Sequence, residues 1–393
     1  MKHSLLDEIK AVCEKAVEDR SAAGLNVLVM KNGQEAAYYE AGFQDLENAV
    51  PMKRDAIFRL YSMSKPVTAA AAMILLERGV ISLDEPVYKY LPSFQHMQVV
   101  TENGTVPAQR DINLRDLLSM QSGMPYGGTS AAGVHAEQVF NDAAQSVDRE
   151  GTLSTIDFAM KLGEGPAEFQ PGSQWMYGSS ADIMGAVIEA ASGKKFGEFL
   201  QDEIFGPLNM KDTGFFIPAE KRDRFAKTYE KDADGQLNEL PTTHLGISYE
   251  WKQEPAFESG GAGLVSTIDD YKKFCLMLLA GGKYGDKRIL RKKTVDYMRS
   301  SQLLPSQREG CWQQFEGLRG YGYGNFCRTL EDPGMSYDLG CKGEYGWDGW
   351  LGCYFAILPE ENIVILSMKQ LKDCGTDSVT RKLRDVILSH LAE

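Results

Sequence analysis

Ser62 and Lys65 lie three residues apart at the head of an apolar stretch, in the run Ser62-Met63-Ser64-Lys65-Pro66. Proline has no amide hydrogen and is tolerated only in the first turn of a helix, so Pro66 predicts a helix that begins between residues 62 and 65. Residues three apart on a helix share one face. A serine hydroxyl becomes a strong nucleophile when a base takes its proton, and desolvation lowers the pKa of a lysine amine. The spacing therefore predicts a nucleophilic serine beside its base.

The segment that follows, Ala69 to Leu76, is apolar all round the helix, which predicts a helix buried in the middle of the protein. A lysine at the head of such a helix must have a partner or a chemical use. The N-terminus of the helix also supplies amide hydrogens and a field that favours a developing oxyanion.

Three further stretches need weighing. A second Ser-x-x-Lys, Ser192 to Lys195, is what chance provides in a chain this long, and we interpret it as a polar helix end. Tyr177-Gly178-Ser179 precedes a predicted helix, where a tyrosine beside a lysine ammonium ionises more easily and takes the serine proton. A competing Tyr323-Gly324-Asn325 lies in a strand-like alternation and is interpreted as structural.

Hydrophobic periodicity outlines the fold. An amphipathic helix, a β-hairpin around Asn32-Gly33 and the buried helix come first, mostly helical segments follow, and strand-like runs and a final helix close the chain. Strands near both ends predict an α/β domain with a central antiparallel sheet flanked by helices, made of residues 1–79 and 215–393, with a mainly helical domain inserted at 80–214. The predicted elements are helices at 5–19, 114–120, 155–162, 181–191 and 377–391, and strands at 25–30, 35–42, 321–328, 350–358 and 363–368.

Composition narrows the function. The 393 residues carry a net charge of -13 and the pI is about 5.0, which argues against a nucleic-acid or anionic-membrane surface. Seven cysteines without Cys-x-x-Cys spacing predict free thiols rather than disulfides or a zinc site. The first ten residues lack the apolar core of a signal peptide, and no apolar run has membrane-spanning length. We expect a soluble, cytoplasmic protein with a small-molecule substrate and no metal or cofactor; the oligomeric state stays open.

Taken together, Ser62-Met63-Ser64-Lys65, Tyr177-Gly178-Ser179 and Gly346-Trp347-Asp348-Gly349 resemble, in order and spacing, the three signature elements of the serine β-lactamase-like hydrolases related to class C β-lactamases. The chain looks most like their esterase branch, the family VIII carboxylesterases. Stretches 114–118 and 260–267 support the resemblance, which covers nearly the whole chain.

The resemblance implies a β-lactamase-like fold and assigns roles to residues. Ser62 would form an acyl-enzyme, Lys65 and Tyr177 would be the proton-transfer pair, and the backbone amides of Ser62 and Trp350 would form the oxyanion hole, with Trp350 just after an element on an edge strand. Expected substrate-binding residues, partly as an apolar acyl or alcohol pocket, are Tyr126, Trp175, Ser179, Trp347, Asp348 and Gly349.

Departures from the family pattern favour an ester over a β-lactam. Trp347 and Asp348 stand where lactamases and penicillin-binding proteins have a Lys-Thr-Gly element, and an acidic residue there would repel an anionic substrate. Ser179 replaces the usual lactamase asparagine, as it does in some esterases.

We therefore predict a serine esterase that cleaves small, short-acyl carboxylic esters. The five histidines are far apart in sequence and no Gly-x-Ser-x-Gly occurs, so a Ser-His-Asp triad or histidine metal site has no local support. Alternatives are acyl transfer to an alcohol or amine, β-lactamase or D-amino-acid peptidase activity in the same site, and a non-catalytic binding protein of this fold.

Overall fold

The computed structural model describes residues 4–146, 152–241, 243–249 and 253–391 of the chain. Its centre is an eight-stranded antiparallel sheet in the order β14-β15-β16-β17-β18-β1-β2-β3. The strands are β1 (Gly24–Lys31), β2 (Gln34–Asp45), β3 (Val50–Pro51), β14 (Tyr321–Tyr323), β15 (Arg328–Leu330), β16 (Tyr345–Asp348), β17 (Tyr354–Leu358) and β18 (Ile363–Lys369).

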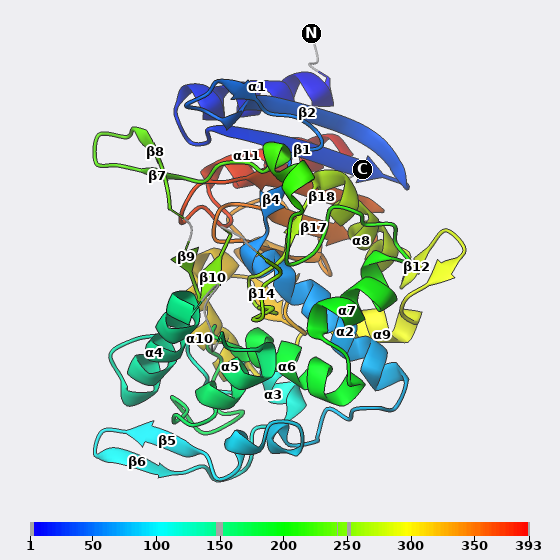
Figure 1. The fold of residues 1–393 in the computed structure, drawn as a ribbon. Helices are drawn as coiled ribbons and strands as arrows, with labels where there is room; N and C mark the ends of the chain where they lie inside the picture. The colour runs from blue at the N-terminus through cyan, green and yellow to red at the C-terminus, as the bar shows by residue number, and fades with distance from the viewer. Residues whose placement is uncertain (1–3, 147–151, 242, 250–252, 392–393) are drawn as a thin grey trace.

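The predicted hairpin around Asn32-Gly33 is confirmed as β1 and β2. Asn32 and Gly33 adopt φ values of 54° and 75°, the positive pair that a tight hairpin turn of matching twist requires. On its other side β1 pairs with β18 along its length, from Leu25 with Lys369 to Lys31 with Ile363. The two ends of the chain are thereby joined inside the sheet (Figure 1).

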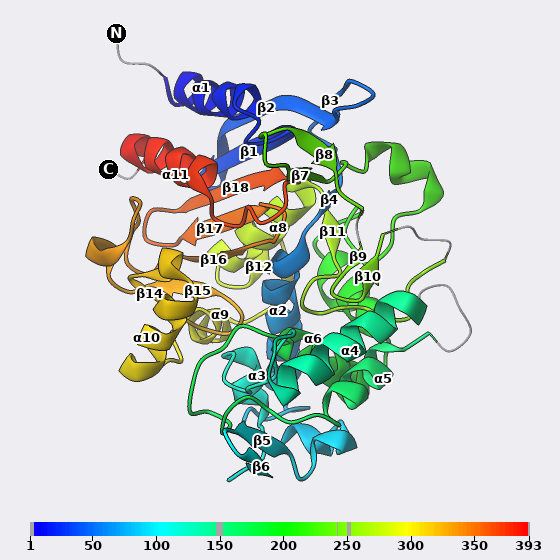
Figure 2. The same cartoon turned by 90° about the vertical axis from the view of Figure 1, so that its left-hand side faces the viewer.

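Helices α1 (Leu5–Glu18) and α11 (Ser378–Leu391) lie together on one face of the sheet, where they share a small apolar core with β1, β17 and β18 (Figure 2). The other face carries α8 (Ile268–Leu279) and the large core that continues into the helical part of the molecule. Helix α2 (Ser64–Glu77) runs from the sheet into that part and packs against α6 (Ser180–Ser192).

Most elements between residues 80 and 214 are helical, as the sequence predicts. The α-helices are α3 (Leu114–Leu118), α4 (Ala131–Ser146), α5 (Thr155–Leu162), α6 and α7 (Phe196–Leu200). The same part of the chain also contains a hairpin of strands β5 (Gln98–Thr101) and β6 (Gly104–Pro107). Helix α6 ends at Gly193, whose φ of 70° is the left-handed conformation that favours glycine at the end of a helix. The remaining helices that matter below are α9 (Lys292–Met298) and α10 (Pro305–Gln314).

Two strand predictions need correction. The expected strand at 321–328 is a hairpin, β14 and β15, because the chain turns at 324–327, where Phe326 has a φ of 54°. The expected strand at 350–358 begins only at Tyr354, since Gly352 turns the chain with a φ of 92°.

The position of β16 within the sheet also differs from the prediction. β14 and β15 lie outside β16, so β16 is not the edge strand that was expected. However, β15 pairs with β16 only at Thr329–Tyr345 and Arg328–Gly346. The end of β16, Trp347 and Asp348, therefore continues past its neighbour and stays open on that side.

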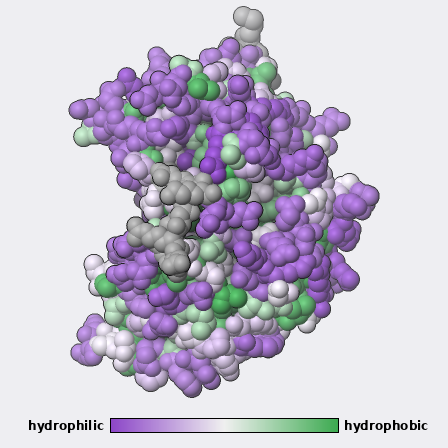
Figure 3. Space-filling model, in the orientation of Figure 1, coloured by the Kyte–Doolittle hydropathy of each residue, from purple (hydrophilic) through white to green (hydrophobic). Residues whose placement is uncertain are grey.

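The face drawn in Figure 3 is largely hydrophilic, with apolar residues scattered among polar ones. All seven cysteines are free, and five of them are buried. Among the described residues, no helix combines the length and apolar character needed to cross a membrane.

Candidate active site

Ser62 lies in a single 3₁₀ turn, Tyr61–Met63, that leads directly into α2. Pro66 stands in the first turn of that helix, as predicted. The preceding Tyr61 has a φ of 45°, a conformation that is strained for a bulky residue. Its fully buried ring is held by Trp350, with ring centres 5.0 Å apart, and by Tyr249. The surrounding packing therefore fixes the turn that presents Ser62.

Lys65 is fully buried one turn further along, and its Nζ donates to Ser62 Oγ at 2.9 Å and to the carbonyl oxygen of Gly261 at 2.8 Å. Burial lowers the pKa of Lys65 to about 7, although Asp182 and Asp348 act in the opposite direction. Near neutral pH a large fraction of the amine is therefore unprotonated and able to take the proton of Ser62.

Tyr177 arrives from the loop before α6 and stands against both residues. Its ring centre is 4.6 Å from Lys65 Nζ, and its hydroxyl accepts a hydrogen bond of 3.0 Å from Trp347 Nε1. Burial raises the pKa of Tyr177 well above its usual range and outweighs hydrogen bonding with Ser62 and Trp347, which lowers it. The expectation that this tyrosine ionises more easily is therefore not supported, and the hydroxyl stays protonated.

The open end of β16 meets the serine turn at Gly349. A Cβ at Gly349 would lie 2.2 Å from the carbonyl oxygen of Leu60, so only glycine permits this approach. The next residue, Trp350, lines the same cavity as Ser62. Within the described residues, the backbone amides of Ser62 and Trp350 donate no hydrogen bond.

A cavity of about 530 Å³ opens over these groups, within the size range of small-molecule sites. One end holds Ser62 and Tyr177, and the other reaches α11. The other lining residues that matter for the argument are Gln314, Phe315, Arg328, Trp347, Asp348, Trp350, Tyr354 and Arg384.

Asp348 does not face this cavity as a lone negative charge. Its Oδ2 accepts hydrogen bonds from Arg328 Nη1, at 3.3 Å, and from Thr376. Arg328 is buried, with its guanidinium carbon 4.8 Å from the ring centre of Tyr354. The repulsion of anionic substrates expected from Asp348 is weakened by this ion pair.

Four of the six expected substrate-binding residues do not line the cavity: Gly349 lies against the serine turn, and the other three stand behind the cavity. Tyr126 packs on Tyr177 with ring centres 6.0 Å apart, and Trp175 packs on the same ring at 6.3 Å. Ser179 is fully buried and donates to the carbonyl oxygen of Met124. The rings of Tyr126 and Trp175 support Tyr177, whereas Trp347, Asp348 and Trp350 face the cavity directly.

Sequence reasoning missed several groups that the structure brings to the site. Gln314 Oε1 accepts the amide hydrogen of Tyr177 at 3.0 Å, and Phe315 packs edge-on against the same ring. No sequence motif pointed to Arg328. Asp182 did carry a signal, because a carboxylate among the apolar residues at the start of a helix raises the same question as Lys65.

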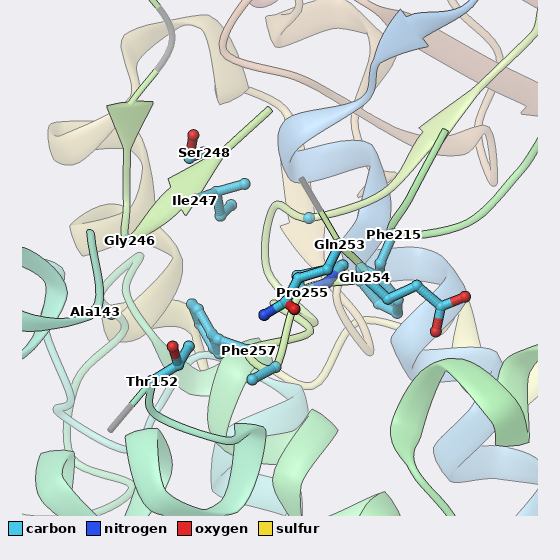
Figure 4. A pocket seen from close by; sticks show the side chains of 12 residues that line it. Ala143, Thr152, Phe215, Gly246, Ile247, Ser248, Gln253, Glu254, Pro255 and Phe257 are labelled. Carbon is cyan, nitrogen blue, oxygen red and sulfur yellow. The ribbon is translucent and has the colours of Figure 1, made fainter. Parts of the chain in front are cut away.

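The second Ser-x-x-Lys match stands apart from this site, whereas the ring of Tyr323 packs edge-on against Trp347 with ring centres 5.2 Å apart. Ser192 is the last residue of α6, where its hydroxyl donates to the carbonyl of Glu189, and Lys195 is the residue directly before α7. Tyr323 is buried with no hydrogen-bond partner for its hydroxyl among the described residues. No metal-ligating cluster occurs in the described part of the chain. A second cavity of about 40 Å³, bordered by Phe215 and Phe257 (Figure 4), contains none of the expected catalytic or substrate-binding residues.

Comparisons with known proteins bear on the family and the fold of the chain. The family profile described as Beta-lactamase matches residues 9–384. Esterase EstB of Burkholderia gladioli is 29% identical over 369 residues, covering 89% of this chain and 86% of that protein. Monacolin J acid methylbutanoyltransferase of Aspergillus terreus is 29% identical over 356 residues, covering 85% of this chain and 81% of that protein. The solved structure of EstCE1, described as a hydrolase with promiscuous acyltransferase activity, superposes with a TM-score of 0.81 at 25% identity and covers 98% of both chains.

Proposed function

Because the chain belongs to the β-lactamase family, we propose that it is a serine hydrolase that cleaves small, short-acyl carboxylic esters through an acyl-enzyme on Ser62. The observation that carries the proposal is the hydrogen bond of 2.9 Å between the buried amine of Lys65 and Ser62 Oγ. This contact places an amine of lowered pKa in direct reach of the nucleophile.

In the proposed acylation, neutral Lys65 takes the proton of Ser62 as Oγ attacks the ester carbonyl. The amides of Ser62 and Trp350, which donate to nothing else in the described residues, receive the oxyanion. Tyr177 gives its hydroxyl proton to the leaving alkoxide and recovers one from the Lys65 ammonium. Water then attacks the acyl group by the reverse proton route, which releases the acid and restores the amine.

An ester is favoured over a β-lactam for two reasons. The cavity offers Trp347 and the paired Asp348 where lactamases hold the substrate carboxylate with a lysine and a hydroxyl. Esterase EstB matches nearly the full length of the chain. Complete retention of Ser62, Lys65 and Tyr177 in contact argues against a non-catalytic binding protein.

Acyl transfer to an alcohol is the second candidate. Both reactions share the first half, and two of the similar proteins are described as having acyltransferase activity. The cavity of about 530 Å³ also leaves room beside a short acyl group for an acceptor. The acceptor would take the place of water in the second half.

The experiment that tests the proposal mixes the protein with p-nitrophenyl butyrate and, separately, with nitrocefin while both chromophores are followed. Intact-protein mass and peptide mapping then locate any acyl adduct. Ester turnover with an adduct on the Ser62 peptide and little nitrocefin cleavage supports the esterase. Rapid nitrocefin hydrolysis would instead indicate a β-lactamase. If neither substrate is turned over and neither forms an adduct, a non-catalytic binding protein is indicated. Added butanol that diverts product to butyl butyrate favours acyl transfer.

The pH dependence of ester turnover follows from Lys65. Below its pKa of about 7 the amine holds a proton and cannot act as base, whereas above it the amine is free. We therefore expect kcat/KM for p-nitrophenyl butyrate to rise through about pH 7 and level off on the alkaline side. A rate that instead falls as pH rises through this range would contradict a neutral amine as the base.

Replacing Tyr177 by Phe is expected to lower kcat/KM by about 10²–10⁴-fold, because the leaving group loses its proton donor. The matched control is Tyr323→Phe, since Tyr323 is a buried tyrosine in the competing motif and its hydroxyl has no partner among the described residues. Its turnover should stay close to that of the wild type. If both variants behave alike, the role assigned to Tyr177 is wrong.

A further inference from the structure

Asp182 is a carboxylate buried in the interior of α6, with 1% of its surface exposed. It lies five residues after Tyr177 on a helix whose neighbouring side chains are mostly apolar. A charge in such surroundings is costly unless hydrogen bonds and an opposite charge compensate it. Nothing in the mechanism above uses Asp182, so its presence needs a reason.

Gly261 connects Asp182 to Lys65. Asp182 Oδ1 accepts hydrogen bonds from Ser259 Oγ at 2.5 Å and from the Gly261 amide at 3.0 Å. The carbonyl oxygen of the same glycine accepts the bond of 2.8 Å from Lys65 Nζ. One backbone residue therefore binds the carboxylate through its amide and the lysine through its carbonyl.

Because Gly261 has no side chain, the space beside Asp182 and Tyr126 stays open. A Cβ there would lie 2.6 Å from Asp182 Oδ2 and 2.9 Å from the hydroxyl oxygen of Tyr126. Both of these buried oxygens have no hydrogen-bond partner among the described residues. Among the described residues, Oδ2 of Asp182 therefore accepts no hydrogen bond, and it lies in the same buried region as the Lys65 amine.

We infer that Asp182 is a positioning residue of this site, whose carboxylate is the buried counter-charge of Lys65 and which, through Gly261, holds the amine against Ser62. The inference rests on the proposed function and deepens it. In each turnover Lys65 alternates between the neutral amine and the ammonium. We assign to Asp182 the role of setting the relative stability of these two protonation states.

The charged and titratable groups around Lys65 support this assignment. Asp182 on α6 and Asp348 on β16 both favour the protonated amine, and Asp182 has the larger effect. Tyr177 and Tyr126 are phenols whose pKa values burial raises, so they contribute no charge. Asp348 shares its charge with Arg328, whereas Asp182 forms no ion pair of its own in the described part of the chain.

Lys65 and Asp182 also affect each other reciprocally. Burial raises the pKa of Asp182, while Lys65 and the hydrogen bonds from Ser259 and Gly261 lower it. The carboxylate therefore stabilises the ammonium that forms when Ser62 loses its proton, and the ammonium stabilises the carboxylate.

The test replaces Asp182 by Asn, an amide of the same shape that can still accept from Ser259 and Gly261. Without the counter-charge the Lys65 ammonium is less stable, so the acid limb of kcat/KM should move to lower pH by about one unit or more. The plateau should fall as well, because the ammonium formed during attack loses its partner. A merely structural role would lower the plateau without moving the limb.

Glu189→Gln is the matched control, since it makes the same chemical change two turns further along α6, where the carboxylate accepts from the Phe196 amide. Its limb should coincide with that of the wild type. A folded Asp182→Asn protein with an unmoved limb overturns the inference.

If the Asp182→Asn protein does not fold, the pH profile of the Ser259→Ala variant tests the inference instead. This substitution removes one donor to Oδ1, which leaves the carboxylate charged less often and should move the limb in the same direction by a smaller amount. An unmoved limb in that variant also overturns the inference. Failure of the proposed function looks different, because the wild type then shows no turnover that depends on Ser62.

Discussion

Replacing Ser62 by Ala is expected to abolish turnover of p-nitrophenyl butyrate, with a loss on the order of 10⁴-fold or more in kcat. Ser62 Oγ is the nucleophile of the proposed acylation, and among the described residues the amine of Lys65 donates to no other hydroxyl. No acyl adduct should appear in the intact mass.

Ser192→Ala is the control for this variant. It removes the serine of the second Ser-x-x-Lys match, at the end of α6, and should leave turnover unchanged. Residual activity of Ser62→Ala near that of the wild type would show that the ester is cleaved elsewhere on the protein, and it would remove the basis of the proposed function.

Replacing Lys65 by Met is expected to lower kcat/KM by about 10²–10⁴-fold, because a side chain of similar length remains but the base is gone. The acid limb near pH 7 should disappear with the amine that causes it. Stopped-flow measurement of the first turnover shows whether acylation itself is slowed.

Stability separates a chemical from a structural loss in this variant. Without the amine, the buried carboxylate of Asp182 loses its counter-charge and the carbonyl of Gly261 loses its donor, so we expect the Tm to fall while the protein still folds. Lys195→Met, in the second motif, should change neither activity nor Tm. A Lys65→Met protein that is folded and still active would refute the assignment of Lys65 as the base.

The residues of the site were predictable to different degrees. Ser62 and Lys65 are three residues apart, and the geometry of one helical turn brings them together without knowledge of the rest of the fold. Tyr177 and Trp347 meet them only through tertiary packing across more than a hundred residues, so their prediction depended on the resemblance to a family.

The misses have physical reasons. The exposure of a side chain depends on what packs over it, which is why Ser179 and Trp175 were expected to line the cavity although other groups cover them. The ionisation of Tyr177 was misjudged because proximity to a cation is visible in a motif, whereas the opposing effect of burial is not. The hairpin at 321–330 was hidden by a glycine-rich alternation that resembles one strand, and this misplaced the edge of the sheet.

The pairing of β1 with β18 has a consequence for biosynthesis. A ribosome delivers the Ser62 turn and α2 early, but the partner that completes the interior of the sheet is β18, near the end of the chain. Gly349 and Trp350, which meet the serine turn, are also translated late. A nascent chain that stops short of them carries Ser62 and Lys65 without the finished site, so competence for acylation should arise only when synthesis is nearly complete.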